Sequence, residues 1–401
     1  MGELSSTEHQ AVELAAAEPM LEQVLAWSAV NSGSRNLDGL KTMADLLGDT
    51  LADLPGDLEM LEPAHVDAVD ASGKAVEIEH GRNLHLKVRP EAPVQLLFTG
   101  HMDTVFGADH AFQQTQWLDD EVLNGPGVAD MKGGIAVMLA ALKAVEASGA
   151  NHLGYEIVIN SDEEVGSLGS APLISQAARA KKAALTYEPS ALPDGTLAGA
   201  RPGSGNFAIT VHGRSAHAGR NPEDGRNAIL AASDLALRFE AMRKAGLSVN
   251  PAKIDGGSPT NVVPDLAVLR VNLRPATPEL EAEANAMIEQ AVAAVATERD
   301  VQIHLHGGFA RPPKPMTPEA KALFGLVKQA GADLGQSIGW QSSGGVCDGN
   351  NIAACGVPVV DTMGVRGGKI HSMEEFLIVQ SLKERAALSA LTILRLPGSA
   401  T

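Results

Sequence analysis

Aromatic residues are scarce in this 401-residue sequence, at 3% of the chain. A core must therefore be built mainly from Ala, Val, Leu and Ile, within a hydrophobic content of 44%. Cations are also few, because 31 Lys and Arg face 49 Asp and Glu, a formal net charge of −18. Nucleic acids and anionic membranes are disfavoured as partners, since phosphate binding needs clustered positive charge. We expect most of the excess carboxylates to form a solvated surface.

Cysteines and long apolar runs are lacking too. Cys347 and Cys355 cannot form a disulfide framework and do not have the paired spacing of a zinc motif. We expect free, buried thiols, which suit a reducing cytoplasm. The N-terminal stretch MGELSSTEHQ has no basic region followed by an apolar one, and no stretch approaches the roughly 20 apolar residues that span a bilayer. The expected location is the cytoplasm.

Short apolar runs alternate with helical patterns over the first 200 residues. The runs predict strands, and apolar spacing of three and four residues predicts helices. Strands are expected at 84–89, 94–101, 155–160 and 183–188, and helices at 19–30, 37–54, 131–148 and 170–181. This alternation predicts an α/β fold, with a doubly wound, mostly parallel sheet covered on both faces.

The pattern changes in the Gly- and Pro-rich stretch at 196–206, a candidate hinge. Alternating strands and two long helices follow, and an open sheet with one face covered by two helices is a compact α+β unit. RPPKPMTP at 311–318 is interpreted as the return linker. We therefore expect an α/β domain of residues 1–200 and 312–401, interrupted by a smaller lid or dimerisation domain at 201–311.

The chain after the linker predicts three more helices and one strand. The helices are expected at 318–334, 348–355 and 374–394, and the strand at 357–363. Asp348 in SGGVCDGNN is expected to cap the short helix or to support a site nearby.

The first candidate site is His101-Met102-Asp103, which ends the strand expected at 94–101. Side chains two residues apart on an extended chain point the same way, so imidazole and carboxylate can touch. Histidines that bind metals commonly donate their second N–H to a carboxylate. His101 is therefore a candidate ligand and Asp103 its orienting partner, although such a pair alone is more typical of an ordinary strand end.

Three acidic candidates follow in the chain. Asp130 in GPGVADMKGG directly precedes an expected helix, where a simple N-cap is the alternative. Glu163 and Glu164 follow the strand YEIVIN, where adjacent carboxylates are costly unless a cation or water satisfies them. One of the two could bind a metal while the other faces a water, and a solvated acidic turn is the alternative.

Two more candidates occupy the same kind of position. Glu188 ends the strand expected at 183–188, and His371 follows the strand expected at 357–363. Alone, each is more often structural. All the candidates together, however, follow strands of one expected sheet, which is where ligands usually bind in open α/β folds.

These residues lie in five motifs that resemble, in the same order, those of a zinc metallopeptidase family. The family contains glutamate carboxypeptidase, acetylornithine deacetylase, succinyl-diaminopimelate desuccinylase and aminoacylase. The motifs are HMDTV at 101–105, GVADMKGG at 127–134, SDEEVGS at 161–167, Glu188-Pro189 and His371-Ser372. The resemblance runs from about residue 20 to 395 and is greatest to glutamate carboxypeptidase-like members.

The resemblance implies a centre of two zinc ions, with cobalt or manganese as alternatives. In it, Asp130 bridges the two ions. His101 and Glu188 complete one site, and Glu164 and His371 complete the other. Histidine and carboxylate ligands with an open position are typical of catalytic zinc.

The implied reaction is hydrolysis of an amide bond by a water between the two metals. Glu163 is the general base, which takes the proton of the water and later delivers it to the leaving amine. Asp103 orients His101. The expected substrate is a C-terminal, glutamate-like residue or an N-acyl amino acid, and the alternative activity is that of a deacetylase or aminoacylase.

The inserted region adds three candidates. His217 in GRSAHAGRNPEDG and Asn261 in SPTNVVPD resemble lid motifs of the same family, which imply that His217 stabilises the oxyanion and Asn261 contacts substrate. Arg274 in NLRP matches an arginine that grips a substrate carboxylate, and an exposed strand arginine is the alternative. The resemblance also implies a homodimer, often with the lid histidine supplied by the partner subunit. Arg366, in the loop before His371, is either an anion contact or a solvated cation.

Two other classes of protein fit the sequence less well. A serine or cysteine hydrolase is disfavoured, and Cys347 has no evident base beside it. A non-catalytic binding module on the same fold would have lost the base or a ligand, whereas all the candidates are present.

Overall fold

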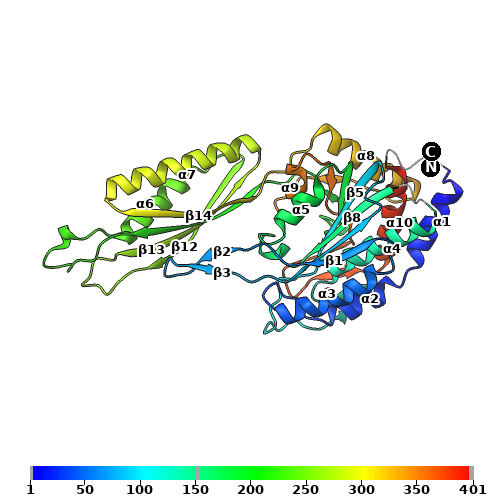
Figure 1. The fold of residues 1–401 in the computed structure, drawn as a ribbon, viewed down its shortest axis with the longest axis horizontal. Coiled ribbons are helices and arrows are strands. Elements are labelled where there is room, and N and C mark those ends of the chain that lie inside the picture. Colours follow the sequence, from blue (N-terminus) through cyan, green and yellow to red (C-terminus); the bar gives the residue numbers. More distant parts are fainter. Residues whose placement is uncertain (1–2, 150–152, 397–401) are drawn as a thin grey trace.

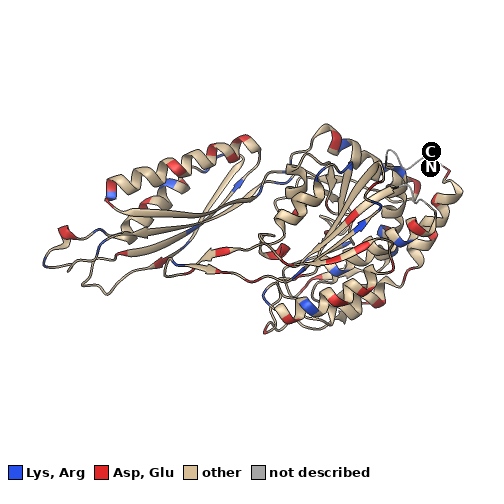
Figure 2. Ribbon diagram, viewed as in Figure 1, with Lys and Arg blue, Asp and Glu red and all other residues tan. Residues whose placement is uncertain are grey.

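The computed structural model of the chain describes residues 3–149 and 153–396. The chain forms two lobes, and the larger one contains both the first and the last helix (Figure 1). Acidic residues are spread over both lobes (Figure 2). Among the described residues, no helix is long and apolar enough to cross a bilayer.

A six-stranded sheet forms the centre of the larger lobe. Its strands β8, β5, β9 and β16 run parallel, and β4 and β1 extend one edge in antiparallel pairing. In spatial order the strands are β1 (Asp57–Leu61), β4 (Asn83–Val88), β8 (Leu153–Asn160), β5 (Val94–His101), β9 (Ala183–Thr186) and β16 (Val359–Val360). The predicted α/β class with a mostly parallel sheet is confirmed.

Helices cover both faces of this sheet, because successive strand residues point to opposite sides. Leu96 and Phe98 of β5 belong to one hydrophobic core, and Leu97 between them belongs to another. The helices of the first core are α1 (Ser6–Ala17), α2 (Met20–Ser28), α3 (Leu37–Leu51), α4 (Gly134–Ala147), α8 (Pro318–Asp333) and α10 (Gln380–Arg395). Those of the second core are α5 (Ala171–Ala178) and α9 (Asp348–Ala354).

The smaller lobe has a core of its own, whose buried members lie between Phe207 and Val301. Its sheet is antiparallel, and alternate residues of strand β13, from Ala267 to Leu273, face that core. In spatial order the strands are β12 (Leu247–Gly256), β13 (Leu266–Pro275), β11 (Ser204–His212) and β14 (Gln302–Arg311), and the helices are α6 (Ala228–Glu240) and α7 (Pro278–Arg299). The domain limits at 201 and 311 stay a prediction, with which the separate cores agree.

The remaining elements are short. A hairpin of β2 (Asp67–Val69) and β3 (Ala75–Glu77) extends from the larger lobe toward the smaller one (Figure 1). The other short strands are β6 (Gln116–Trp117), β7 (Val122–Asn124), β10 (Leu197–Ala198), β15 (Trp340–Gln341), β17 (Gly367–Gly368) and β18 (Phe376–Ile378). The helical turns are η1 (Val128–Gly133), η2 (Glu163–Val165) and η3 (Pro222–Asp224).

Several sequence-based expectations differ from the structure. Helix α1 was not predicted, because its buried face consists of only Ala11 and Ala15. The last helix begins at Gln380 rather than 374, since the preceding residues pair as β18. Cys355 is exposed rather than buried, whereas Cys347 is buried as expected.

Candidate functional site

Three predicted ligands lie at or just after the carboxyl ends of strands of the parallel sheet. His101 is the last residue of β5, Glu164 lies in η2 after β8, and Glu188 follows β9 by two residues. Asp130 differs from the expectation of a single sheet, because it lies in η1, directly before α4 and after β7 of another sheet. Because the carboxyl ends of parallel strands meet at one edge of a sheet, these side chains converge. His371, between β17 and β18, approaches the same edge.

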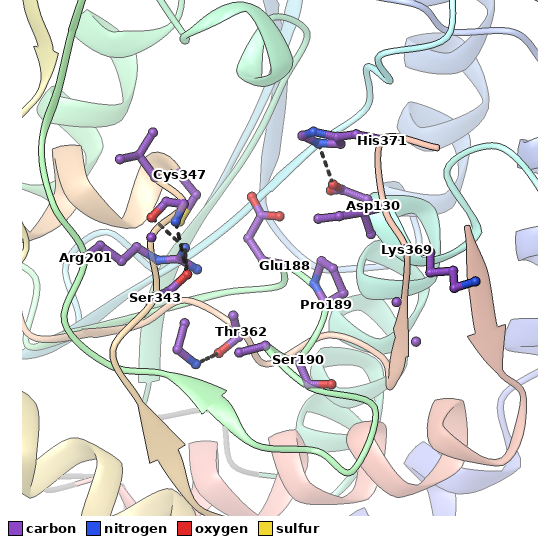
Figure 3. Close-up of a pocket in the computed structure, with 18 of the residues that line it drawn as sticks. Asp130, Glu188, Pro189, Ser190, Arg201, Ser343, Cys347, Thr362, Lys369 and His371 are labelled. Atoms are coloured by element: carbon purple, nitrogen blue, oxygen red, sulfur yellow. Dashed lines mark hydrogen bonds and ion pairs between the residues drawn. The ribbon is translucent and has the colours of Figure 1, made fainter. Parts of the chain in front are cut away.

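Asp130 lies between the two histidines, and Figure 3 shows its contact with His371. Its Oδ1 is 3.1 Å from Nε2 of His101, and its Oδ2 is 3.3 Å from Nε2 of His371. Nε2 of His101 is also 3.7 Å from Oε1 of Glu188, and Nε2 of His371 is 3.0 Å from Oε2 of Glu164. One carboxylate oxygen for each histidine is the arrangement that a bridging ligand requires.

The donor atoms also fall into two compact groups that share His101. In one, ligand atoms of His101, Asp130 and Glu164 lie within 4.8 Å of one another; in the other, those of His101, Glu163 and Glu188 do. These groups divide the carboxylates differently from the ligand sets that the sequence resemblance implies. Both nonetheless place nitrogen and oxygen donors of the kind zinc prefers around one small volume.

The electrostatics of this volume fit a divalent cation. Burial and then the charge of Asp130 raise the pKa of Glu188 to about 8, and the same two causes raise the pKa of Glu164 well above its usual range. Hydrogen bonds to Asp130 and Glu164 raise the pKa of His371 to about 11. Glu164 and Glu188 therefore bind protons more readily than ordinary carboxyl groups, and a bound metal would replace those protons.

Asp103 joins the ligand His101 to the turn that carries Glu163 and Glu164. It is fully buried, and Nδ1 of His101 lies 3.0 Å from its backbone carbonyl oxygen and 3.3 Å from its Oδ1. The same oxygen accepts the backbone N–H of Glu163 at 3.1 Å, and Oδ2 accepts that of Glu164 at 3.2 Å and the hydroxyl of Ser34 at 2.7 Å. The contact fits the predicted orienting role, which stays a prediction.

The backbone around Asp130 explains the glycines of its motif. Gly127 has a φ of 72°, in the left-handed region that favours glycine. At Gly134 a Cβ would lie 1.9 Å from the carbonyl oxygen of Tyr187, so only glycine allows α4 this close to the chain before Glu188.

Glu375 also holds this loop, and sequence reasoning missed it. Its carboxylate accepts the backbone N–H groups of Ala129 and Asp130 at 3.0 Å and that of Gly127 at 3.3 Å. Burial is the main reason that the pKa of Glu375 is raised to about 7. The sequence gives no signal for this contact, since Glu375 looked like an acidic residue at the start of the last helix.

Arg311 was also missed, because 311–318 was interpreted only as a linker. Its guanidinium is buried beside the predicted base, with Nη1 2.5 Å from Oε1 of Glu163. Asp348 lies nearby and accepts from Ser167 Oγ at 2.5 Å and from Asn160 Nδ2 at 2.9 Å. Asp348 is thus the first residue of α9, whose N-cap is Cys347, and it holds Ser167 after η2, so the support alternative fits and the capping one does not.

A cavity of about 760 Å³ opens onto the site (Figure 3). Asp130, Glu163, Glu188 and His371 line it, so the predicted base and three predicted ligands can be reached from it. Arg201 also lines the cavity, although its guanidinium forms a buried, two-bonded pair with Asp361, at 2.7 and 3.2 Å.

Two residues near the cavity have no catalytic contacts. The alternative that Arg366 contacts an anion is wrong, because its side chain donates to the carbonyl of Pro193 at 2.9 Å and to the carboxylate of Glu384 at 3.0 Å. Cys347 donates to Asp361 across 3.4 Å, and burial raises the pKa of its thiol well above the usual value. A thiol held protonated is a poor nucleophile, as expected.

The candidates of the smaller lobe stand apart from the predicted ligands. His217 and Asn261 are exposed neighbours, and neither is among the described residues that line the cavity. Nδ1 of His217 accepts the backbone N–H groups of Gly219 and Arg220 at 3.1 Å, so its Nε2 is left as the donor. Arg274 is closer, since its Nη1 donates to the carbonyl of Gly344, which lines the cavity, at 3.1 Å.

Comparison with known proteins decides the family. Residues 97–395 match Peptidase family M20/M25/M40. The chain belongs to this family. Its members are hydrolases, and the M20 chain is accordingly a metal-dependent hydrolase.

Relatives of the M20 chain cover most of its length. Carboxypeptidase G2 of Pseudomonas sp. (strain RS-16) is 30% identical over 335 residues, 80% of this chain and 79% of that protein. A succinyl-diaminopimelate desuccinylase of Psychrobacter arcticus is 29% identical over 369 residues, 86% of this chain and 87% of that protein. The crystal structure of a tripeptidase from Staphylococcus aureus has the same fold, with a TM-score of 0.71 over 94% of this chain and 97% of that chain at 24% identity.

Proposed function

We propose that this M20 chain is a two-zinc hydrolase that cleaves the amide bond of a C-terminal, glutamate-like residue or of an N-acyl amino acid. The observation that carries the proposal is the position of Asp130, with one carboxylate oxygen toward each histidine. His101 and Glu188 would hold one ion with it, and Glu164 and His371 the other. Cobalt and manganese suit the same donors.

Each residue has a distinct part in the proposed reaction. A metal pair at this site supplies Lewis-acid activation of the scissile carbonyl and of the attacking water. Glu163, which lines the cavity, accepts the proton of that water while the oxygen of the water bonds to the carbonyl carbon. When the C–N bond breaks, Glu163 gives the proton to the leaving amine. Asp103 keeps the ring of His101 oriented through Nδ1.

The smaller lobe contributes the rest of the proposed site. His217 presents Nε2 as a donor and would stabilise the oxyanion, Asn261 would contact the substrate, and Arg274 would bind a substrate carboxylate. Since His217 lies outside the cavity, it reaches the substrate only by movement of its lobe or from the partner subunit of a homodimer. We place the enzyme in the cytoplasm.

The relatives support two substrate classes. Similarity to carboxypeptidase G2 supports removal of a C-terminal residue, and similarity to the desuccinylase supports removal of an N-acyl group. The second candidate activity is therefore that of an N-acyl amino acid deacylase.

A hydrolysis screen with added zinc tests the proposal. It compares N-acyl amino acids, dipeptides and folate-like glutamates, with chelator-treated protein as the control. We expect release of an amino acid from one class only, lost on chelation, and two equivalents of zinc per chain. Folded protein that binds no zinc and hydrolyses none of the three classes would instead support a non-catalytic binding module.

A further inference from the structure

We propose that Arg311 is a positioning residue for Glu163. The inference rests on the proposed function, in which Glu163 is the general base. It assigns a task to the first residue of RPPKPMTP, which otherwise only connects the two lobes.

The guanidinium of Arg311 holds both the side chain and the main chain of Glu163. Nη1 donates to Oε1 of Glu163 at 2.5 Å, and Nη2 donates to the Glu163 carbonyl at 2.8 Å. Nη2 also donates to Oγ of Ser167 at 2.8 Å, and Asp348 lies 3.7 Å away as a further counter-charge. The side chain is only 4% exposed, so water competes little for these bonds. One planar fork therefore fixes the base and the turn that carries it.

Arg311 is itself held in place from both sides. It is the last residue of β14, where it pairs with Ser204 of β11. The side chain of Asn351 donates to the carbonyl of Ala310 at 2.9 Å, and that of Asn350 donates to the carbonyl of Pro312 at 2.8 Å. The residues before and after Arg311 are thus attached to α9 of the larger lobe, which makes the guanidinium a rigid support.

This support decides where the free oxygen of Glu163 lies. Oε1 is engaged by Arg311, while the carboxylate still has an oxygen within 4.8 Å of donor atoms of His101 and Glu188. A general base must lie within hydrogen-bond reach of the proton it removes. A displacement of 1 Å can lower a rate by about 100-fold, so the loss of Arg311 should slow the chemical step.

The test measures kcat, KM and bound zinc for Arg311→Met, Arg311→Lys, Glu163→Gln and the double variant Arg311→Met/Glu163→Gln. We expect Arg311→Met to lower kcat by roughly 10- to 100-fold, with KM and two zinc ions retained. Arg311→Lys should recover part of the loss, since it keeps the charge but not the fork. The double variant should be no slower than Glu163→Gln, because the position of an absent base does not matter.

Arg89→Met is the matched control. Arg89 likewise binds a glutamate, Glu146 at 3.0 Å, and a backbone carbonyl, that of Leu153 at 2.6 Å, but it lies at the end of β4. We expect a lower melting temperature and unchanged kcat for it. A second readout needs no metal. In thermal unfolding of the zinc-free protein, the free energy of unfolding of the double variant should fall by less than the sum of the losses in the two single variants.

The outcomes separate this inference from the proposed function. The positioning role would be overturned if Arg311→Met had a normal kcat, whether or not KM rose. It would also be overturned if the kcat of the double variant fell by the product of the two single losses. Normal kcat in Glu163→Gln would instead overturn the base and, with it, the purpose of Arg311, while additive unfolding losses would show that the two side chains do not interact.

Discussion

The two lobes present their candidate residues in opposite ways. In the larger lobe His101, Asp103 and Asp130 are buried and in contact, and His371 is the exposed exception, whereas both His217 and Asn261 of the smaller lobe are exposed. Side chains that hold a metal must be fixed in advance, because each buried carboxylate there is costly without hydrogen-bond partners and a cation. Residues that meet only the bound substrate can stay in water until then. The larger lobe therefore provides a half of the site that is formed before substrate binds, and the smaller lobe provides a half that is completed when substrate binds.

Asp130→Ala should have the largest effect, because it removes the residue that lies between both histidines. We expect the loss of both zinc ions and of all measurable hydrolysis, a larger effect than the roughly 10- to 100-fold loss of metal affinity that follows loss of a supporting residue. Zinc analysis after gel filtration, together with a hydrolysis assay, checks this. Retention of one tightly bound ion would rule out a bridging role.

His217→Ala tests the exposed half. We expect kcat to fall by about 100-fold or more, as on loss of an oxyanion donor, while zinc content and melting temperature stay unchanged because the side chain is exposed. Kinetics and calorimetry on the same sample measure both. If kcat is unaffected, the smaller lobe does not complete the site through this residue.

Asp103→Ala tests whether burial alone keeps the candidate metal ligands of the larger lobe in place. It removes the acceptor of two backbone N–H groups and the carboxylate beside His101, while the backbone carbonyl 3.0 Å from Nδ1 of His101 stays. We expect zinc affinity to fall by about 10- to 100-fold, which competition with a chromophoric chelator measures. Unchanged affinity would mean that the ring of His101 is oriented without it.

Arg274→Lys should have the smallest effect. Lysine keeps the charge but cannot bind a carboxylate through two parallel bonds. We expect KM to rise by roughly 10-fold, the equivalent of about 1.4 kcal/mol, with kcat retained. The control is a substrate whose C-terminal carboxylate is amidated, for which the substitution should make no difference; an equal rise for both substrates would exclude carboxylate binding.

The sequence predicted the larger lobe well where the signal was local. Short apolar runs located β5, β8 and β9, and the residues that follow them are the ones that converge. Contacts between distant segments gave no such signal. Glu375 supports the loop of Asp130 from 245 positions away, and Arg311 reaches Glu163 from 148 positions away. Neither has a periodicity or a neighbouring motif that points to its partner.

Local signals also misled where packing decided the outcome. Arg366 lies five residues before His371 in a Gly-rich loop, yet Glu384 on α10 turns its side chain away from the cavity. The strand expected at 357–363 shrinks to Val359–Val360, because β16 pairs with the short β9. Such details depend on neighbours that only the folded chain supplies.

The central claim is that Asp130 lies between two metal ions. A crystal structure of zinc-loaded protein, with anomalous diffraction recorded at the zinc edge, tests it most directly. We predict two peaks about 3.5–4 Å apart, one beside each oxygen of the Asp130 carboxylate. A single peak, or two peaks of which one lies away from Asp130, would contradict it.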